Sequence, residues 1–115
     1  MFLILYKSSR LAVVNINNAS PQEASYIINE LTLRFVNSRD FTVIERMDID
    51  HILTEQNFQM SGYVSDASML SIGRFLGATV VITGSIDGAG AQRRLVLKAL
   101  DVLTSEILTM SSVPL

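Results

Sequence analysis

The sequence of 115 residues contains no cysteine and only one histidine, His51. Without cysteine there are no disulfides to support the fold, and thiol chemistry is excluded. With one histidine and no nucleophile-elbow motif, the serines lack the base and the turn that a Ser-His-Asp triad requires. We therefore do not expect a hydrolase of the serine or cysteine type.

Charged residues and long apolar runs are also scarce. Charged side chains make up 17% of the chain, and 9 basic against 11 acidic residues give a net charge of −2. This balance provides no basic surface for a nucleic-acid backbone, so nucleic acid is not expected as a ligand. The apolar run at residues 2–6 is far shorter than the ~20 residues that span a bilayer, and it lacks the basic start and cleavage site of a secretory signal.

The chain does contain enough apolar residues for one folded domain. Hydrophobic residues make up 49% of the sequence, which excludes disorder, and 115 residues is a usual length for a single domain. We expect residues 10–115 to form this domain. Two interpretations of residues 1–9 are open: a strand or stretch packed along the domain edge, or the remnant of a longer N-terminal linker or anchor region.

The first helix is the most clearly marked element. It follows β-branched and apolar residues at 10–16, which predict a strand buried on both faces. Ser20, Pro21 and Glu23 form a capping box, in which the Ser20 hydroxyl accepts from the Glu23 amide and the Glu23 carboxylate accepts from the Ser20 amide. The apolar stripe of this helix consists of Ala24, Ile27, Ile28, Leu31 and Phe35.

Two shorter helices are expected in the middle of the chain. A strand at residues 41–45 leads into a helix whose apolar residues are Ile49, Ile52 and Leu53. After an irregular segment at residues 57–64, Ser65 or Asp66 caps a helix that ends at Gly77, where a left-handed residue is favoured. The apolar residues of this third helix are Met69, Leu70, Ile72, Phe75 and Leu76, and Gly73 lets it approach the sheet.

The last third of the chain predicts three strands joined by hairpins. They are expected at residues 78–86, 95–102 and 106–110, with a turn at residues 87–90 and with Gly84 at a bulge or close backbone approach. The order β-α-β-α-α-β-β-β indicates an α/β fold whose early strands pair in parallel and whose late strands pair antiparallel. We expect a mixed sheet of about five strands with three helices packed on it.

Two segments look like ligand sites, but neither has the spacing that the chemistry requires. Asp48, Asp50 and His51 are close in sequence, yet side chains one or two positions apart on a helix diverge, so a metal site is not expected. The glycines between residues 84 and 90 are followed by a strand, and not by the lysine and helix of a phosphate-binding loop. We expect no metal, no cofactor and no catalytic residue.

Several motifs together resemble one family. Residues 41–46 (FTVIER), 52–62 (ILTEQNFQMSG) and 72–78 (IGRFLGA) are similar to the signature of curli-secretion-channel (CsgG-type) periplasmic domains. The related lipoprotein activators of penicillin-binding proteins share that fold and have a similar ending, which residues 98–107 (KALDVLTSEI) resemble. The resemblance covers residues 10–112.

The resemblance implies a bacterial cell-envelope protein of the periplasm that is often lipid-anchored and acts by protein–protein contact. The implied partner is a penicillin-binding protein or a component of an outer-membrane assembly, and a homo-oligomer is a further alternative. The chain has no room for the membrane hairpins of the channel-forming members, so a pore is not expected. It also has neither the signal nor the acylated cysteine of the lipoprotein members, so either an N-terminal anchor part was removed or this member differs in location.

The partner-facing surface is expected on segments that the core does not require. The irregular segment before the third helix supplies Phe58, Gln59 and Tyr63, and the hairpin supplies Arg93 and Arg94. The alternative is a small-molecule or nucleotide-binding α/β module, which would hold its ligand beyond the carboxyl ends of the strands. A deep cavity lined by converging polar groups would favour this alternative, whereas a flat and partly apolar patch would favour docking.

Overall fold

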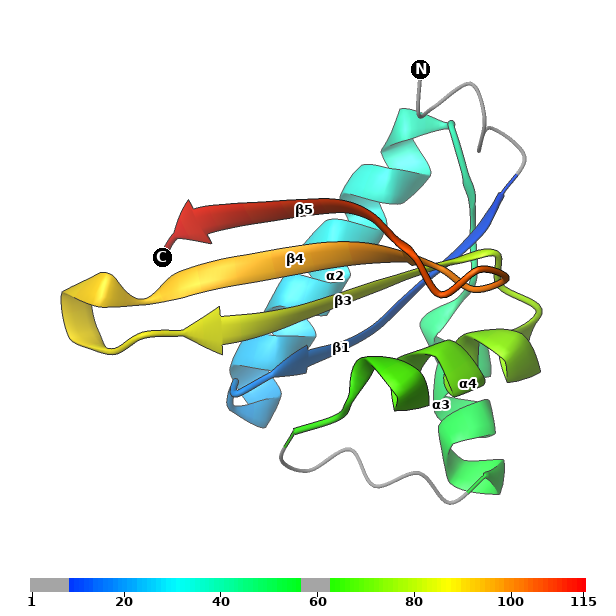
Figure 1. Ribbon diagram of the computed structural model, residues 1–115, viewed down its shortest axis with the longest axis horizontal. Coiled ribbons are helices and arrows are strands. Elements are labelled where there is room, and N and C mark those ends of the chain that lie inside the picture. Colours follow the sequence, from blue (N-terminus) through cyan, green and yellow to red (C-terminus); the bar gives the residue numbers. More distant parts are fainter. Residues whose placement is uncertain (1–8, 57–62) are drawn as a thin grey trace.

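The fold is a five-stranded sheet with helices on both of its faces (Figure 1). The computed structural model describes residues 9–56 and 63–115. Its strands are β1 (Arg10–Asn17), β2 (Thr42–Val43), β3 (Val80–Asp87), β4 (Arg94–Asp101) and β5 (Ile107–Pro114). Its helices are α2 (Pro21–Ser38), α3 (Arg46–Glu55) and α4 (Asp66–Leu76), with a 3₁₀ turn at Gly90–Gln92. The predicted fold class and order of elements are confirmed.

The sheet is mixed, with the strand order β2-β1-β3-β4-β5. β1 pairs in parallel with both β2 and β3, because helices carry the chain back across the sheet before each of these pairings. β3, β4 and β5 are antiparallel neighbours joined by short connections. Parallel pairing therefore lies on one side of β3 and antiparallel pairing on the other, as predicted.

Each face of the sheet has its own apolar core. α2 covers one face, where Ile27 and Ile28 pack against alternate residues of β1, β3 and β4. α3 and α4 cover the other face toward one end, and they leave the end of β3 and β4 that carries the hairpin uncovered (Figure 1). β1 contributes to both cores, so every residue of this strand except the first is buried.

The helix boundaries follow the predicted caps. Ser20 Oγ accepts from the Glu23 amide at 3.1 Å, and Ser65 caps α4 in the same way. Gly77 ends α4 in the left-handed region, with φ of 70°. The second half of the predicted capping box is wrong, since the Glu23 carboxylate accepts from the Arg93 guanidinium at 2.8 and 2.9 Å. A charged donor forms a stronger bond with a carboxylate than an amide does.

Three details differ from the prediction. β2 has two residues because α3 begins at Arg46, directly after the turn out of the strand. β5 continues to Pro114, since it pairs with β4 along the whole length of that strand. Phe75 is 53% exposed, because it lies at the margin of the stripe by which α4 packs on the sheet.

Gly73 and Gly84 lie where two elements approach closely. A Cβ atom at Gly73 would be 2.6 Å from Val81 Cγ2 and 3.0 Å from Val102 Cγ2, so α4 rests directly on the sheet at this point. A Cβ atom at Gly84 would be 2.9 Å from Ile16 Cδ1. Both glycines therefore serve close packing, which confirms the expectation for each of them.

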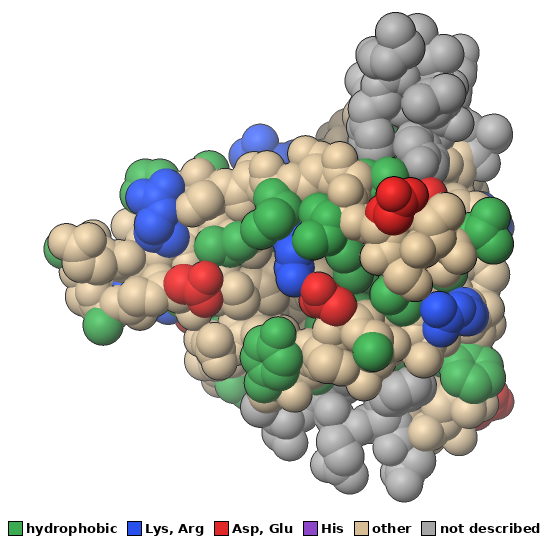
Figure 2. Space-filling model, viewed as in Figure 1, with side chains coloured by type: hydrophobic (Ala, Val, Ile, Leu, Met, Phe, Trp, Pro, Cys, Tyr) green, Lys and Arg blue, Asp and Glu red, His purple; other side chains and the backbone are tan. Residues whose placement is uncertain are grey.

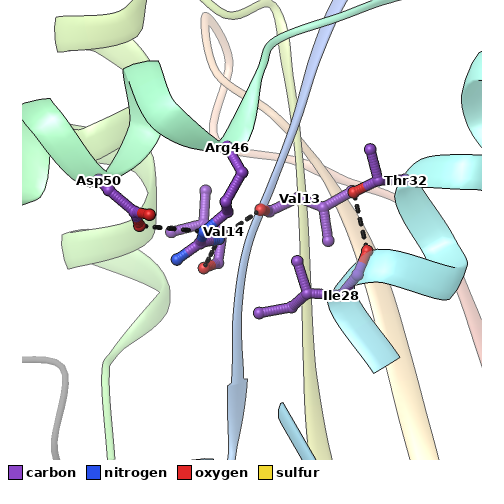
Figure 3. Close-up of polar contacts among 6 residues, drawn as sticks. All are labelled: Val13, Val14, Ile28, Thr32, Arg46 and Asp50. Carbon is purple, nitrogen blue, oxygen red and sulfur yellow. Dashed lines mark hydrogen bonds and ion pairs between the residues drawn. The ribbon is translucent and has the colours of Figure 1, made fainter. Parts of the chain in front are cut away.

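Arg46 completes the edge of β1 beyond the point where β2 stops (Figure 3). The register of β1 shifts between Val13 and Asn15, which marks a bulge. Arg46 Nη1 donates to the carbonyl oxygens of Val13 and Val14 at 3.0 and 2.8 Å, and its Nε donates to Asp50 Oδ1 at 3.0 Å. The guanidinium thus supplies the donors that a longer β2 would have provided to these two carbonyls.

Candidate docking surface

The face of β4 and β5 on the side of α4 is only partly covered. β4 directs Val96 and Lys98 to this side, where both are half-buried. On β5, Met110 lies opposite Lys98 and is 55% exposed. Figure 2 shows this side of the molecule, with apolar side chains around a basic and an acidic side chain near the middle. We call this area the open face; it consists of Arg94, Val96, Lys98, Met110 and Ser112.

An ion pair lies at the centre of the open face. Lys98 Nζ is 2.6 Å from Oδ2 of Asp66, the first residue of α4. The N-terminus of a helix favours a negative charge, so Asp66 is well placed to hold the lysine. The two side chains are 24% and 40% exposed, so a partner that covers them would remove the remaining water from the pair.

The structure separates the two arginines that the sequence placed together. Arg93 turns toward α2, where its Nη2 contacts both carboxylate oxygens of Glu23. Arg94 lies on the opposite side, in the open face. Its Nε donates to Ser112 Oγ at 2.8 Å, and its Nη2 donates to the Ser112 carbonyl at 3.2 Å. Arg93 therefore ties the hairpin to the fold, whereas Arg94 remains on an exposed surface.

Tyr63 is the third described residue among the predicted contact residues. Its side chain is 71% exposed, although Val64 after it is buried in the core beneath α3 and α4. Val64 packs on the α4 side of the sheet, which is also the side of Arg94. The other two predicted residues, Phe58 and Gln59, lie outside the described residues.

A buried polar contact between distant parts of the chain holds the backbone of Val64, the residue after Tyr63. Asn17, at the end of β1, donates to the Val64 carbonyl at 3.0 Å and accepts from the Val64 amide at 2.9 Å. Asn15 donates to Asn17 Oδ1 at 3.2 Å. The pair of bonds mimics a strand pairing, so the backbone next to Tyr63 is fixed relative to the sheet.

The larger depressions do not have the form expected of an enclosed ligand site. One of about 560 Å³ lies at the amino ends of β1 and β3 and is lined by Ser9, Arg74, Ala78, Thr79, Asp101, Val102 and Leu103. Ligands of open α/β sheets bind at the opposite, carboxyl ends. Near the carboxyl half of β1 there is a cleft of about 240 Å³, which is below the usual size of a small-molecule site. Its one arginine, Arg46, is already bonded to β1 and Asp50.

His51 is paired within its own helix. Its Nε2 lies 2.8 Å from Glu55 Oε2, and both side chains are more than half exposed. Within residues 9–56 and 63–115, no three His, Asp or Glu side chains gather in a way that could hold a metal ion. In the same part of the chain, every helix is too short or too polar to cross a bilayer.

The comparison with protein families shows what kind of protein carries this surface. Residues 6–94 match the family model described as "Curli production assembly/transport component CsgG". The chain belongs to the CsgG family. The family resemblance seen in the sequence motifs is therefore confirmed, and membership supports an accessory role in the cell envelope.

Solved structures with the same fold include two of LpoB and one of another lipoprotein. The LpoB C-terminal domain from Salmonella enterica has a TM-score of 0.77 at 21% identity, over 93% of this chain and 82% of that one. LpoB from Escherichia coli, solved by NMR, has a TM-score of 0.75 at 20% identity, over 94% and 56%. Lipoprotein GNA1162 from Neisseria meningitidis has a TM-score of 0.64 at 13% identity, over 93% and 79%. No curated protein matches the sequence.

Sequence reasoning missed two features of this surface. Lys98 interrupts an apolar row of β4, which signals a charged group on a partly buried face, but its partner Asp66 lies 32 positions away and has no local signal. Asn17 comes at the end of a buried strand, where asparagine is typical of a turn. Its bonds to Val64, 47 positions later, have no local signal in the sequence.

Proposed function

We propose that the chain is a non-enzymatic accessory domain of the bacterial cell envelope that docks onto a protein partner in the periplasm. The match of residues 6–94 to the CsgG family carries this proposal. The open face supports it, because a partly exposed strand face with mixed apolar and charged side chains suits a protein partner. We assign the docking domain to residues 10–115 and treat residues 1–9 as a separate N-terminal segment.

The contact surface that we propose is the open face together with Tyr63. Tyr63 and Met110 provide exposed apolar area, and Tyr is enriched among residues that dominate binding energy. Arg94 and the Lys98–Asp66 pair provide polar groups that orient a partner. Phe58 and Gln59 remain predicted contact residues on the basis of sequence.

The partner class that we favour is a penicillin-binding protein. The reason is the resemblance of the sequence motifs to lipoprotein activators of such enzymes, together with the fold shared with LpoB. The second candidate is a component of an outer-membrane secretion or assembly complex, which the family description favours. With either partner, the domain acts as a binding module.

Site-specific photo-crosslinking in native envelopes tests this proposal. A photoreactive phenylalanine analogue would replace Tyr63 in the full-length gene product, and the matched control would carry it at Tyr26. Tyr26 is exposed to a similar extent, at 68% against 71%, but lies on α2. We expect position 63 to crosslink to an envelope protein, identified by mass spectrometry, and position 26 to give no such product.

The identity of the product separates the candidates. A penicillin-binding protein or an outer-membrane component would support one or the other version of the proposal. Recovery of soluble metabolic enzymes alone, or equal products from both positions, would contradict docking through this surface. Binding of a nucleotide in calorimetry, abolished by changes around the cleft at Asn15 and Asn29, would favour the small-molecule alternative.

A further inference from the structure

The cleft of about 240 Å³ lies where the connections of two neighbouring strands diverge. The chain leaves β1 for α2, which packs on one face of the sheet, and it leaves β2 for α3, which packs on the other face. Connections that diverge in this way open a crevice beyond the carboxyl ends of the strands, where open α/β sheets bind ligands. Here the crevice is lined by residues of β1, α2 and α3.

Asn15 provides an acceptor in this cleft. Its side chain is 9% exposed, and its Nδ2 donates to Asn17 Oδ1 at 3.2 Å. The two bonds of Asn17 with Val64 fix the orientation of the Asn17 amide, and this fixes the orientation of Asn15 in turn. Asn15 Oδ1 has no hydrogen-bond partner among the described residues. Since no unpaired side-chain oxygen in this part of the chain is sealed from the surface, Oδ1 is available in the cleft that Asn15 lines.

Arg46 provides a donor that is held in a fixed position. Its Nη1 and Nε make three bonds, to two carbonyls of β1 and to Asp50 (Figure 3). Its Nη2 donates to no acceptor within residues 9–56 and 63–115, and the side chain is 33% exposed. Because the guanidinium is already fixed, little conformational freedom is lost when Nη2 binds a further acceptor.

Asp50 adds a negative charge beside this donor. Its Oδ1 accepts from Arg46 Nε at 3.0 Å, while its Oδ2 makes no hydrogen bond within the described part of the chain. The wall formed by α2 includes the apolar side chains of Ala24 and Ile28. The described lining therefore combines one positive charge, one negative charge, a neutral acceptor and an apolar wall.

We propose that this cleft binds a small α-amino acid in its zwitterionic form. The ligand carboxylate accepts from Arg46 Nη2, and the ligand ammonium donates to Asp50 Oδ2 and Asn15 Oδ1. The ligand side chain lies against Ala24 and Ile28, and the volume of the cleft restricts it to a small one. The proposal does not rest on docking to an envelope protein, because the cleft and the open face share no residue.

The first test is an NMR titration of the full chain with L-alanine. The amide signals of Asn15, Ser25 and Asp50 should shift in a saturable manner, with a dissociation constant of about 1 mM or below. Glycine and L-serine should shift the same signals. If none of the three amino acids shifts these signals at concentrations up to about 50 mM, the proposal is overturned.

Two analogues of alanine test whether both charges of the ligand are recognised. Alaninamide lacks the carboxylate that Arg46 binds, and N-acetyl-L-alanine lacks the ammonium that Asp50 and Asn15 bind. Each should bind about tenfold more weakly than L-alanine or less tightly still, because a polar group of the site loses its partner. An analogue that binds as tightly as L-alanine would overturn the assignment of a zwitterion.

Variants of exposed residues test the location of the site. Asp50→Asn should weaken the binding of L-alanine about tenfold, whereas Asp48→Asn, also on α3 but outside the cleft, should leave it unchanged. Ser25→Trp places a large side chain in the cleft and should abolish binding, and Asn37→Trp near the end of α2 is its control. Circular dichroism would verify that each variant is folded. Unchanged binding in both Asp50→Asn and Ser25→Trp would overturn the proposed site.

Discussion

Two glycines of α4 are required for different physical reasons. Gly73 lies against the sheet, where any Cβ atom would meet Val81 and Val102. Gly77 has open space around it, with no atom within 4 Å of a Cβ position, but its φ of 70° is costly for any residue with a side chain. The first glycine is therefore selected by packing, and the second by backbone conformation.

This difference predicts a specific pattern of stability changes. Gly73→Ala should lower the free energy of unfolding by about 1–3 kcal/mol, because its Cβ atom overpacks the core. Val81→Ala provides space at the same place, so the double variant should be less destabilised than the sum of the single changes. Gly77→Ala should cost about 1–2 kcal/mol and should be additive with Val81→Ala. Urea denaturation of the original chain, the three single variants and the two double variants measures these changes, and additivity in both pairs would contradict the packing role of Gly73.

The role of Arg46 depends on two carbonyl groups. Its guanidinium is the donor to Val13 and Val14 at the bulge, while its contact with Asp50 is an exposed pair one helical turn apart. Arg46→Ala should lower the free energy of unfolding by about 2 kcal/mol or more, because two carbonyls lose their donor. Asp50→Ala should cost less than about 0.5 kcal/mol. Equal effects of the two changes in denaturant unfolding would show that the ion pair, and not the carbonyls, is the important contact.

At the scale of elements, local signals predicted the helices better than the strand ends. The hydroxyls of Ser20 and Ser65 and the left-handed Gly77 act through bonds to residues within one turn, so they are visible in sequence. β2 could not be delimited in this way, because it ends where Arg46 replaces it as the partner of β1. Phe75 was predicted as a core residue from its spacing, but it lies beside α3 at the margin of the packed stripe and is 53% exposed.

The approach to α4 depends on Asn17, which lies 47 residues earlier in the chain than its partner Val64. Asn17→Ala should lower the free energy of unfolding by about 1–3 kcal/mol, since both backbone groups of Val64 lose a buried partner. Hydrogen exchange should also become faster at the Val64 amide. Asn29→Ala on α2 is the matched control and should change neither quantity. Unchanged protection at Val64 in the Asn17 variant would contradict the proposed restraint on the segment beside Tyr63.

At the scale of the whole molecule, the open face has little to do with holding the fold together. The Lys98–Asp66 pair is partly exposed, and such pairs contribute about 1 kcal/mol or less. Its position could not be inferred from sequence, because β4 and α4 come together only through the sheet topology. The sequence predicted a strand at residues 95–102, and the structure shows that Val96 and Lys98 on one of its faces are only half-buried.

The Lys98–Asp66 pair therefore offers a way to separate folding from docking. Replacing both residues, by Lys98→Met and Asp66→Asn, should change the free energy of unfolding by less than about 1 kcal/mol. The same double variant should reduce crosslinking from position 63 to the envelope partner several-fold, if the partner contacts the pair. Full crosslinking with unchanged stability would remove the pair from the contact surface. The double change Arg34→Met and Glu30→Gln, on α2, removes one charge of each sign away from the open face and serves as the control.

The position of β1 between β2 and β3 has a consequence for how the protein folds. β3, β4 and β5 are neighbours in sequence and can associate early as a local meander, whereas β1 must be joined to β3 across some 70 intervening positions. Closing so long a loop is slow compared with forming hairpins. We therefore expect β1 to join the meander late and to bring in β2, which pairs with β1; until then neither apolar core is complete. During synthesis β1 is made before β3, so its apolar residues stay unpaired until β3 follows. In this interval the nascent chain is most prone to aggregation.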